Sequence, residues 1–337
     1  MTLTASDARY ERERQLAMDA VRDAARLCRA VQEGIHLTSM DKEDRSPVTI
    51  ADFGSQALIC RALEEAFPED VVVAEEDSAA LRQPSQAESL SRVLDCVKAV
   101  RDDVETESLL RWIDRGGDGG GHPGRFWTLD PIDGTKGFLR RGQYAIALAL
   151  IVDSRIEVAA MACPNLPAGL GVEPTGPGSL FVAVRGRGVE VIPLDDSRPA
   201  SPVRVSDRID PKLARLCESV ESGHSAHDLA ATIAGELGLA GAPVRLDSQA
   251  KYAVVARGDA DIYLRLPTRA DYREKIWDHA SGTLILQEAG GTVTDITGKP
   301  LDFSRGRELS ENRGVVATNG PWHDRVLAAL AGALGRS

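Results

Sequence analysis

Apolar residues near the N-terminus recur at the spacing of one helix face. The positions that fit this face are Leu16, Val21, Leu27, Val31 and Ile35. The pattern predicts a long first helix that ends near Gly34. A second helix is predicted to begin after Thr49 and to stop before Pro68, with Thr49 and Asp52 resembling a capping pair at its start.

After Pro68 the pattern changes to short apolar runs typical of strands. These runs predict strands at 71–74, 125–129, 144–152, 156–162, 179–184 and 188–192. Signals are weaker over 81–125, where 90–100 is predicted to be helical and the glycine-rich segment 115–124 to be a loop. The glycine run lacks the GxGxxG and Lys-Ser/Thr patterns of phosphate-binding loops, so we interpret it as a surface loop.

Beyond Pro202 predicted strands and helices alternate. Helices are predicted at 225–237, 277–289 and 321–334, and strands at 262–266, 291–295 and 314–318. The expected organisation is an α+β domain over residues 1–160 that packs on an α/β domain over residues 161–337.

The composition excludes several classes of function. Lys and Arg total 40 against 51 Asp and Glu, a formal net charge of −11, whereas binding to a nucleic acid polymer requires many basic side chains. The longest apolar run, 145–152, is too short to span a membrane, and the polar segment 1–14 lacks the core of a signal peptide. The five cysteines form no CxxC pair and indicate reduced apolar residues. We therefore expect a cytoplasmic protein with no membrane partner.

The strongest chemical signal is the segment Trp127-Thr-Leu-Asp-Pro-Ile-Asp-Gly-Thr-Lys-Gly-Phe138. Asp130 and Asp133 flank a proline where a predicted strand ends, with the Ile132 carbonyl between them, and carboxylates are the usual protein ligands of Mg²⁺. The two amides after Asp133 stand where a helix could start and could face a phosphate. Taken alone, the segment is equally compatible with a turn that favours Asp.

Two further acidic positions change this interpretation. Glu75 follows the predicted strand 71–74, and Asp278 lies in the first turn of a predicted helix. Alone, the first is typical of a solvated loop and the second of a favourable helix-start carboxylate. Together with Asp130 and Asp133 they form the oxygen-rich set that a multi-metal phosphatase needs. Because two unit charges about 4 Å apart repel by about 4 kcal/mol at an effective dielectric near 20, such a set requires cations between its members.

These motifs, taken jointly, resemble those of a known family. The chain resembles the lithium-sensitive, inositol-monophosphatase-like superfamily. The motifs that carry this resemblance are Glu-Glu-Asp-Ser at 75–78, Asp-Pro-Ile-Asp-Gly-Thr at 130–135, and Trp-Asp-His-Ala-Ser-Gly at 277–282 before Glu-Ala-Gly-Gly at 288–291. Within this superfamily, the chain resembles the 3′(2′),5′-bisphosphate nucleotidases. The motifs that carry this closer resemblance are Asp133-Gly-Thr-Lys-Gly-Phe138, Gly223-His-Ser-Ala-His-Asp228, and Leu246-Asp-Ser-Gln-Ala-Lys-Tyr252 leading into 262–267. The resemblance implies a layered αβαβα sandwich of the sugar-phosphatase (inositol monophosphatase / fructose-bisphosphatase) type, and it is weak over 81–125 and 164–178.

The resemblance also implies roles for individual residues. It implies a site for two or three Mg²⁺ ions, whose ligands would be Glu75, Asp130, the Ile132 carbonyl, Asp133 and Asp278. It also implies that Li⁺ inhibits the enzyme by binding at a Mg²⁺ site. Asp52 and Thr135 would orient and deprotonate the attacking water. The residues implied to contact the substrate are Thr135, His224, Ser248, Lys251, Arg265 and Asp278.

From the residues alone, most of these positions have an ordinary alternative. Asp52 is then a helix-start carboxylate, Lys251 a solvated charge and His224 a surface residue. Arg265 differs, because it alternates with apolar residues in a predicted strand and needs a partner, which a ligand phosphate would supply.

The implied activity is Mg²⁺-dependent hydrolysis of the 3′-phosphate of adenosine 3′,5′-bisphosphate to AMP and phosphate. By resemblance, 3′-phosphoadenylyl sulfate is a second substrate, which links the enzyme to sulfur assimilation. Ser248, Lys251 and Arg265 favour a nucleotidase over an inositol (poly)phosphate 1-phosphatase. A non-catalytic nucleotide sensor is disfavoured by the complete set of expected ligands and water-activating residues. The oligomeric state stays open, and a monomer is compatible with the sequence.

Overall fold

Two long helices begin the part of the chain that the structure describes. This computed structural model describes residues 9–34, 46–121, 124–167, 178–195, 198–220, 227–267, 269 and 271–335. α1 (Glu11–Gly34) and α2 (Ser46–Ala66) pack against each other. Small residues bring them close, since a β-carbon at Gly54 of α2 would lie 2.9 Å from the Leu27 side chain of α1.

A seven-stranded sheet forms the next layer. Its strands are β1 (Val71–Ala74), β2 (Arg125–Asp133), β3 (Ala145–Val152), β4 (Arg155–Cys163), β5 (Ser179–Val184), β6 (Val189–Pro193) and β7 (Ser201–Pro202). They lie in sequence order, with β1 parallel to β2 and each later pair antiparallel. β3 and β4 are buried along nearly their whole length, which explains why they are almost continuously apolar.

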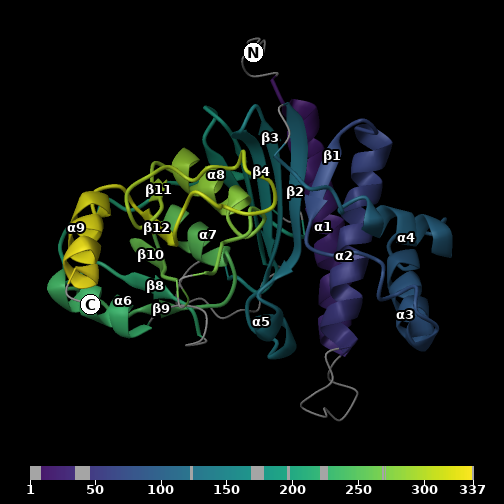
Figure 1. Cartoon of the computed structure of the whole chain (residues 1–337), viewed down its shortest axis with the longest axis horizontal. Coiled ribbons are helices and arrows are strands. Elements are labelled where there is room, and N and C mark those ends of the chain that lie inside the picture. The colour runs from purple at the N-terminus through teal and green to yellow at the C-terminus, as the bar shows by residue number, and fades with distance from the viewer. Residues whose placement is uncertain are drawn as a thin grey trace.

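Helices on the other face of this sheet separate it from a second sheet (Figure 1). These helices are α7 (Ala250–Ala256) and α8 (Ala280–Glu288). The second sheet has the order β11-β12-β10-β8-β9. Its strands are β8 (Leu216–Glu218), β9 (Val244–Arg245), β10 (Ile262–Arg265), β11 (Thr292–Thr294) and β12 (Val315–Thr318). α6 (His227–Glu236) and α9 (His323–Leu334) pack on its outer face.

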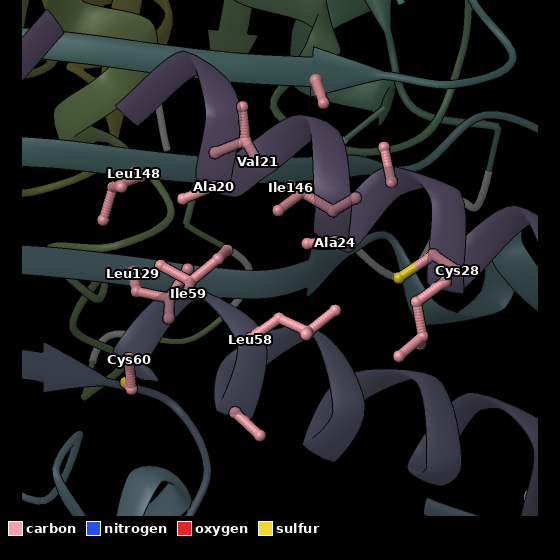
Figure 2. Packing of buried hydrophobic residues seen from close by; sticks show 14 of the residues in the cluster. Ala20, Val21, Ala24, Cys28, Leu58, Ile59, Cys60, Leu129, Ile146 and Leu148 are labelled. Carbon is pink, nitrogen blue, oxygen red and sulfur yellow. The ribbon is translucent and has the colours of Figure 1, made fainter. Parts of the chain in front are cut away.

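Three hydrophobic clusters fill the spaces between the layers. The first joins α1 and α2 to the seven-stranded sheet, the second joins that sheet to α7, α8 and the five-stranded sheet, and the third lies under α6 and α9. Figure 2 shows part of the first cluster, with Ala20, Val21, Ala24, Leu58, Ile59, Leu129, Ile146 and Leu148. The layer order is the αβαβα sandwich that the resemblance implied, which confirms the mixed α+β and α/β fold class.

The remaining elements flank these layers. η2 (Pro84–Gln86), α3 (Ala87–Lys98) and α4 (Thr106–Asp114) lie outside α2, and α5 (Thr135–Leu139) follows β2. Within the described ranges, every helix is too short or too polar to cross a membrane.

The first sheet extends past the domain division expected from sequence. A boundary between residues 160 and 161 falls inside β4, and β5, β6 and β7 then add to the same sheet. The sheet continues because each of these strands pairs with the one before it along the chain. The change to the second sheet therefore comes between β7 and β8.

Two predicted helix starts differ from the observed ones. α2 begins at Ser46, so Thr49 and Asp52 lie inside the helix and not at its start. α8 begins at Ala280, so Asp278 precedes the helix. Trp277 is buried like the helix residues that follow it, and the apolar pattern therefore runs past the true boundary.

Candidate active site

The paired aspartates lie where β2 becomes irregular. β2 pairs with β3 up to Asp130 and again at Asp133, with a register shift between them. Pro131 has no N–H for the ladder, and its carbonyl accepts a hydrogen bond from Ser55 Oγ of α2 (2.9 Å). Asp130, Ile132 and Asp133 all line one cleft. The irregularity thus presents several oxygen ligands at the end of one strand.

The turn after Asp133 begins a short helix, as the sequence predicted. Gly134 has a φ of 91°, which glycine adopts readily, and a β-carbon there would lie 3.0 Å from Cβ of Ser248. Thr135 opens α5 and is exposed at the cleft. The close approach of Gly134 to Ser248 brings the β2 turn against the segment that leads into α7.

Glu75 reaches the same cleft because β1 runs parallel to β2, so both strands end at one edge of the sheet. Gln56 of α2, which is fully buried, holds the chain just beyond this point. Its side-chain oxygen accepts a hydrogen bond from Glu76 N (3.1 Å), and its Nε2 donates to Glu76 O (2.7 Å). The exit of β1 is therefore anchored to the helix layer.

Asp278 enters the cleft from the loop before α8. The buried Gln249 connects this loop to the β2 turn: its Nε2 donates to Trp277 O (3.1 Å), and its backbone N donates to Asp133 Oδ2 (2.5 Å). Gln249 was not among the predicted site residues, although it lies in the Asp-Ser-Gln segment that carried part of the resemblance.

The structure brings all of the predicted metal ligands to one cleft, whose lining includes Glu75, Asp130, Ile132, Asp133 and Asp278. Glu75 keeps solvent access at the rim, yet partial burial and the charges of Glu76 and Asp133 raise its pKa to about 7. Burial and the charge of Asp133 raise the pKa of Asp278 to about 7. For the buried Asp130, desolvation followed by the surrounding carboxylates holds the pKa well above its usual range. Desolvation is the largest cause of each shift, and repulsion among carboxylates gathered without cations adds to it.

The donor set fits a divalent cation. Asp130 Oδ1 is buried and has no hydrogen-bond partner among the described residues, an arrangement that is unfavourable for a carboxylate unless a cation satisfies it. The ligand atoms available at the β1 and β2 ends and at Asp278 are all oxygens, which Mg²⁺ prefers.

A second acidic group lies beside this set but has other partners. Ligand atoms of Glu274, Asp278 and His279 fall within 4.8 Å of one another. Both ring nitrogens of His279 are engaged, Nδ1 with Tyr252 Oη (2.8 Å) and Nε2 with Glu274 (3.1 Å). We therefore assign His279 and Glu274 to the support of the cleft wall.

Glu274 also contacts a predicted substrate residue. Its carboxylate pairs with Nε of Arg265 on β10 (3.3 Å). Burial by itself would raise the pKa of Glu274, but the hydrogen bond from His279 and the charge of Arg265 lower it. This network was not predicted, because it joins a strand to a loop that local periodicity does not connect.

Lys251 on α7 brings a buried positive charge to the same cleft. Its Nζ donates to Leu246 O (3.3 Å) and lies 5.3 Å from the centroid of the Tyr263 ring. Burial lowers the pKa of Lys251. Ser248, also buried, has a φ of 70° and lines the cleft nearby. An anionic group is the natural partner for an ammonium held in such a place.

Two predicted site residues stand apart from this set. Asp52 is buried in α2 and is not among the described residues that line the cleft; burial, with the charges of Glu76 and Glu75, raises its pKa well above the usual value. His224 lies outside the residues that the structure describes.

Comparison with known proteins supplies the family. The sequence profile of the inositol monophosphatase family matches residues 10–334. The chain belongs to the inositol monophosphatase family. Members of this family are phosphatases that generally depend on Mg²⁺, in agreement with the acidic cleft.

Within the inositol monophosphatase family the chain is similar to proteins named 3′(2′),5′-bisphosphate nucleotidase. That of Emericella nidulans is 46% identical over 346 residues, covering 95% of this chain and 98% of its own. That of Schizosaccharomyces pombe is 45% identical and covers 96% of both chains. That of Oryza sativa is 45% identical, with 96% of this chain and 95% of its own covered. This confirms the resemblance seen in the motifs.

Solved structures of the family show the same fold. SuhB of Mycobacterium tuberculosis has a TM-score of 0.63 at 21% identity, with 98% of this chain and 100% of its own covered. The IMPase of Thermotoga maritima has a TM-score of 0.62 at 18% identity, with coverage of 96% and 98%.

Proposed function

We propose that the chain hydrolyses the 3′-phosphate of adenosine 3′,5′-bisphosphate to give AMP and inorganic phosphate. One observation carries the proposal: the residues that line one cleft include the carboxylates of Glu75, Asp130, Asp133 and Asp278 together with the basic side chains of Lys251 and Arg265. The first group suits a phosphoryl group with its cations, and the second suits another phosphate of the same molecule. A substrate with two phosphates uses both halves of the cleft.

The proposed Mg²⁺ ligands are the four carboxylates and the Ile132 carbonyl, in a site for two or three ions. Bound Mg²⁺ would supply positive charge that neutralises the phosphoryl oxygens and makes a nearby water more acidic. The lack of a hydrogen-bond partner for Asp130 Oδ1 among the described residues and the raised pKa values of Glu75 and Asp278 support this assignment.

Thr135 and Asp52 are proposed to prepare the attacking water. The Thr135 hydroxyl, exposed at the start of α5, orients the water for in-line attack on phosphorus. Asp52, buried beside the Glu75–Glu76 charges, is not among the described residues that line the cleft, so it would accept the proton that the water loses by way of the Thr135 hydroxyl. The water oxygen bonds to phosphorus as the P–O3′ bond breaks, and the 3′-oxygen takes up a proton from solvent and leaves as the hydroxyl of AMP.

The basic side of the cleft is proposed to hold the rest of the nucleotide. Lys251 and Arg265 bind its second phosphate, with Arg265 held in place by its ion pair to Glu274. Ser248 and His224 complete the contacts. Because the sulfated relative 3′-phosphoadenylyl sulfate carries the same 3′-phosphate, we propose it as a second substrate.

A phosphate-release panel tests this function. Metal-stripped protein is supplied with Mg²⁺ and then with adenosine 3′,5′-bisphosphate, 3′-phosphoadenylyl sulfate or inositol 1-phosphate. We expect the bisphosphate to have the highest kcat/KM. Faster turnover of the inositol ester would replace the nucleotidase with an inositol phosphatase, and tight nucleotide binding without phosphate release would indicate a sensor.

A further inference from the structure

The glycine loop, defined here as residues 116–121, is packed tightly against the second half of the chain. A β-carbon at Gly120 would lie 3.0 Å from the carbonyl carbon of Gly306, and one at Gly121 would lie 2.9 Å from Gly306 N. Gly116 is buried, and a β-carbon there would lie 2.6 Å from Cβ of Ala74. Gly120 and Gly121 therefore stand where two backbones meet, and Gly116 where the loop packs on the end of β1, which a free surface loop does not require.

Arg307 fastens this contact. Its Nη2 donates to Ala74 O (2.5 Å), and its Nη1 donates to Asp118 O (2.9 Å) and Gly116 O (3.4 Å). Its guanidinium lies over the Trp277 ring, 4.7 Å from the centroid. A single side chain thus connects the end of β1, the glycine loop and the loop before α8.

The contacts fall on the neighbours of two proposed metal ligands. Ala74 precedes Glu75, and Ala74 N donates to Gly116 O (2.8 Å). Trp277 precedes Asp278, and the Arg307 carbonyl accepts a hydrogen bond from Ile276 N (3.1 Å). Glu75 itself keeps solvent access at the rim, so its position depends on how the backbone beside it is held.

We propose that Arg307 and the glycine loop position Glu75 relative to Asp278 for the binding of Mg²⁺. Arg307 is a positioning residue, since its contacts are with the protein backbone and the Trp277 ring. The inference rests on the proposed metal site and is independent of which phosphate ester is the substrate.

The sign of the effect separates positioning from simple electrostatics. Arg307 carries a positive charge close to Glu75, so loss of that charge alone would strengthen cation binding. Loss of its three backbone contacts would weaken binding, because the ligand would no longer be held in place. The two explanations therefore predict opposite changes in Mg²⁺ affinity.

The test is calorimetric titration of the metal-stripped full chain with Mg²⁺, for the unaltered protein and for Arg307→Ala. We expect Arg307→Ala to weaken Mg²⁺ binding by about 10-fold or more, with KM for the bisphosphate at saturating Mg²⁺ unchanged. Unchanged or tighter binding would overturn the proposal. Lys275→Met is the matched control, since Lys275 also places positive charge near Glu75 but pairs with Glu308 (2.5 Å); we expect it to leave Mg²⁺ affinity unchanged or slightly higher.

A glycine pair gives a second, independent arm. Gly121→Ala forces the loop away from Gly306 and is expected to weaken Mg²⁺ binding in the same direction. Gly186→Ala is its control, because Gly186 has a similar φ (78° against 73°) and a β-carbon there would have no described residue within 4 Å. Equal Mg²⁺ affinity in these two variants, both folded by circular dichroism, would contradict the proposal. If no nucleotide is hydrolysed but Arg307→Ala still weakens Mg²⁺ binding, the proposed function fails while this inference stands.

Discussion

The buried charged residues of the cleft differ in the sign of their charge and so in the ligand that would stabilise them. Asp130 is 1% exposed and carries an oxygen with no partner among the described residues, so an ionised Asp130 is unfavourable until a cation binds. Lys251 is 2% exposed and carries a positive charge, so it is stabilised when an anion binds beside it. Substitutions that keep shape but remove charge can therefore separate catalysis from substrate binding.

Asp133→Asn should reduce turnover while the fold is retained. The amide oxygen can still accept the hydrogen bond from Gln249 N, but the negative charge available to a cation is lost. We expect kcat to fall by about 100-fold or more, with an unchanged circular dichroism spectrum. Near-normal turnover at saturating Mg²⁺ would contradict the role given to Asp133.

Lys251→Met should act mainly on substrate binding. Methionine retains the packing against the Tyr263 ring but cannot pair with a phosphate. We expect KM for the bisphosphate to rise about 10-fold, equivalent to about 1.4 kcal/mol, with kcat nearly unchanged. The exposed Lys212→Met serves as the control. Equal KM values in the two variants would remove Lys251 from the phosphate site.

At the scale of elements, the packing of α7 on α8 sets the distance between the two sides of the cleft. α7 carries Lys251, and the loop before α8 carries Asp278. Gly282 of α8 faces the ring of Tyr252 of α7, and a β-carbon at this position would collide with that ring. The two helices thus approach closely only because residue 282 has no side chain.

Gly282→Ala should therefore destabilise the protein. We expect overpacking to lower the free energy of unfolding by about 1–3 kcal/mol, measured by urea titration. The control is Gly235→Ala in α6, where a β-carbon would meet no described residue within 4 Å and alanine should add up to about 1 kcal/mol. If both variants changed the free energy of unfolding in the same direction, the close contact between α7 and α8 would not require glycine at position 282.

The same elements show what could be predicted from sequence. Long amphipathic or strongly apolar segments such as α1 and β3 were predicted nearly to their ends, and acids at strand ends located Glu75, Asp130 and Asp133. α7 was missed because all seven of its residues are buried, so it has no polar face to mark a helical period. Short strands such as β8 carry too few residues for a pattern.

Contacts between distant segments were beyond the sequence. Gln249, Glu274 and Arg307 were not predicted, since each acquires its role from a partner far along the chain. The glycine loop was interpreted as a surface loop for the same reason. Its packing against Gly306 depends on two segments whose proximity no local pattern encodes.

For the molecule as a whole, the cleft exists only when the layers are assembled. Glu75 and the β2 aspartates come from the edge of the first sheet, Asp278 from the layer of α8, and Arg265 from the second sheet. A cation bound by residues from several layers binds the folded chain and not the unfolded one. Mg²⁺ should therefore stabilise the fold, to an extent that depends on pH.

The sign of this pH dependence follows from the carboxylates. Without cations, folding raises the pKa of Glu75 and Asp278 to about 7, above their ordinary values of 4.5 and 3.8. Groups with raised pKa values contribute stability at low pH that is lost as the pH rises through about 7. The unfolding temperature of the metal-free chain should fall between about pH 5 and about pH 8, and Mg²⁺ should raise it more at the higher pH. Scanning calorimetry that shows equal Mg²⁺ stabilisation at both values would contradict this linkage.

We propose that these carboxylates, distant in sequence, share divalent cations in one cleft. The most direct measurement is an anomalous difference map from crystals soaked in Mn²⁺, which replaces Mg²⁺ at oxygen sites. We expect peaks between Asp130 and its neighbours Glu75, Asp133 and Asp278. Peaks only at other positions, or no peak in the cleft of crystals soaked at a saturating concentration of Mn²⁺, would contradict a shared cation site.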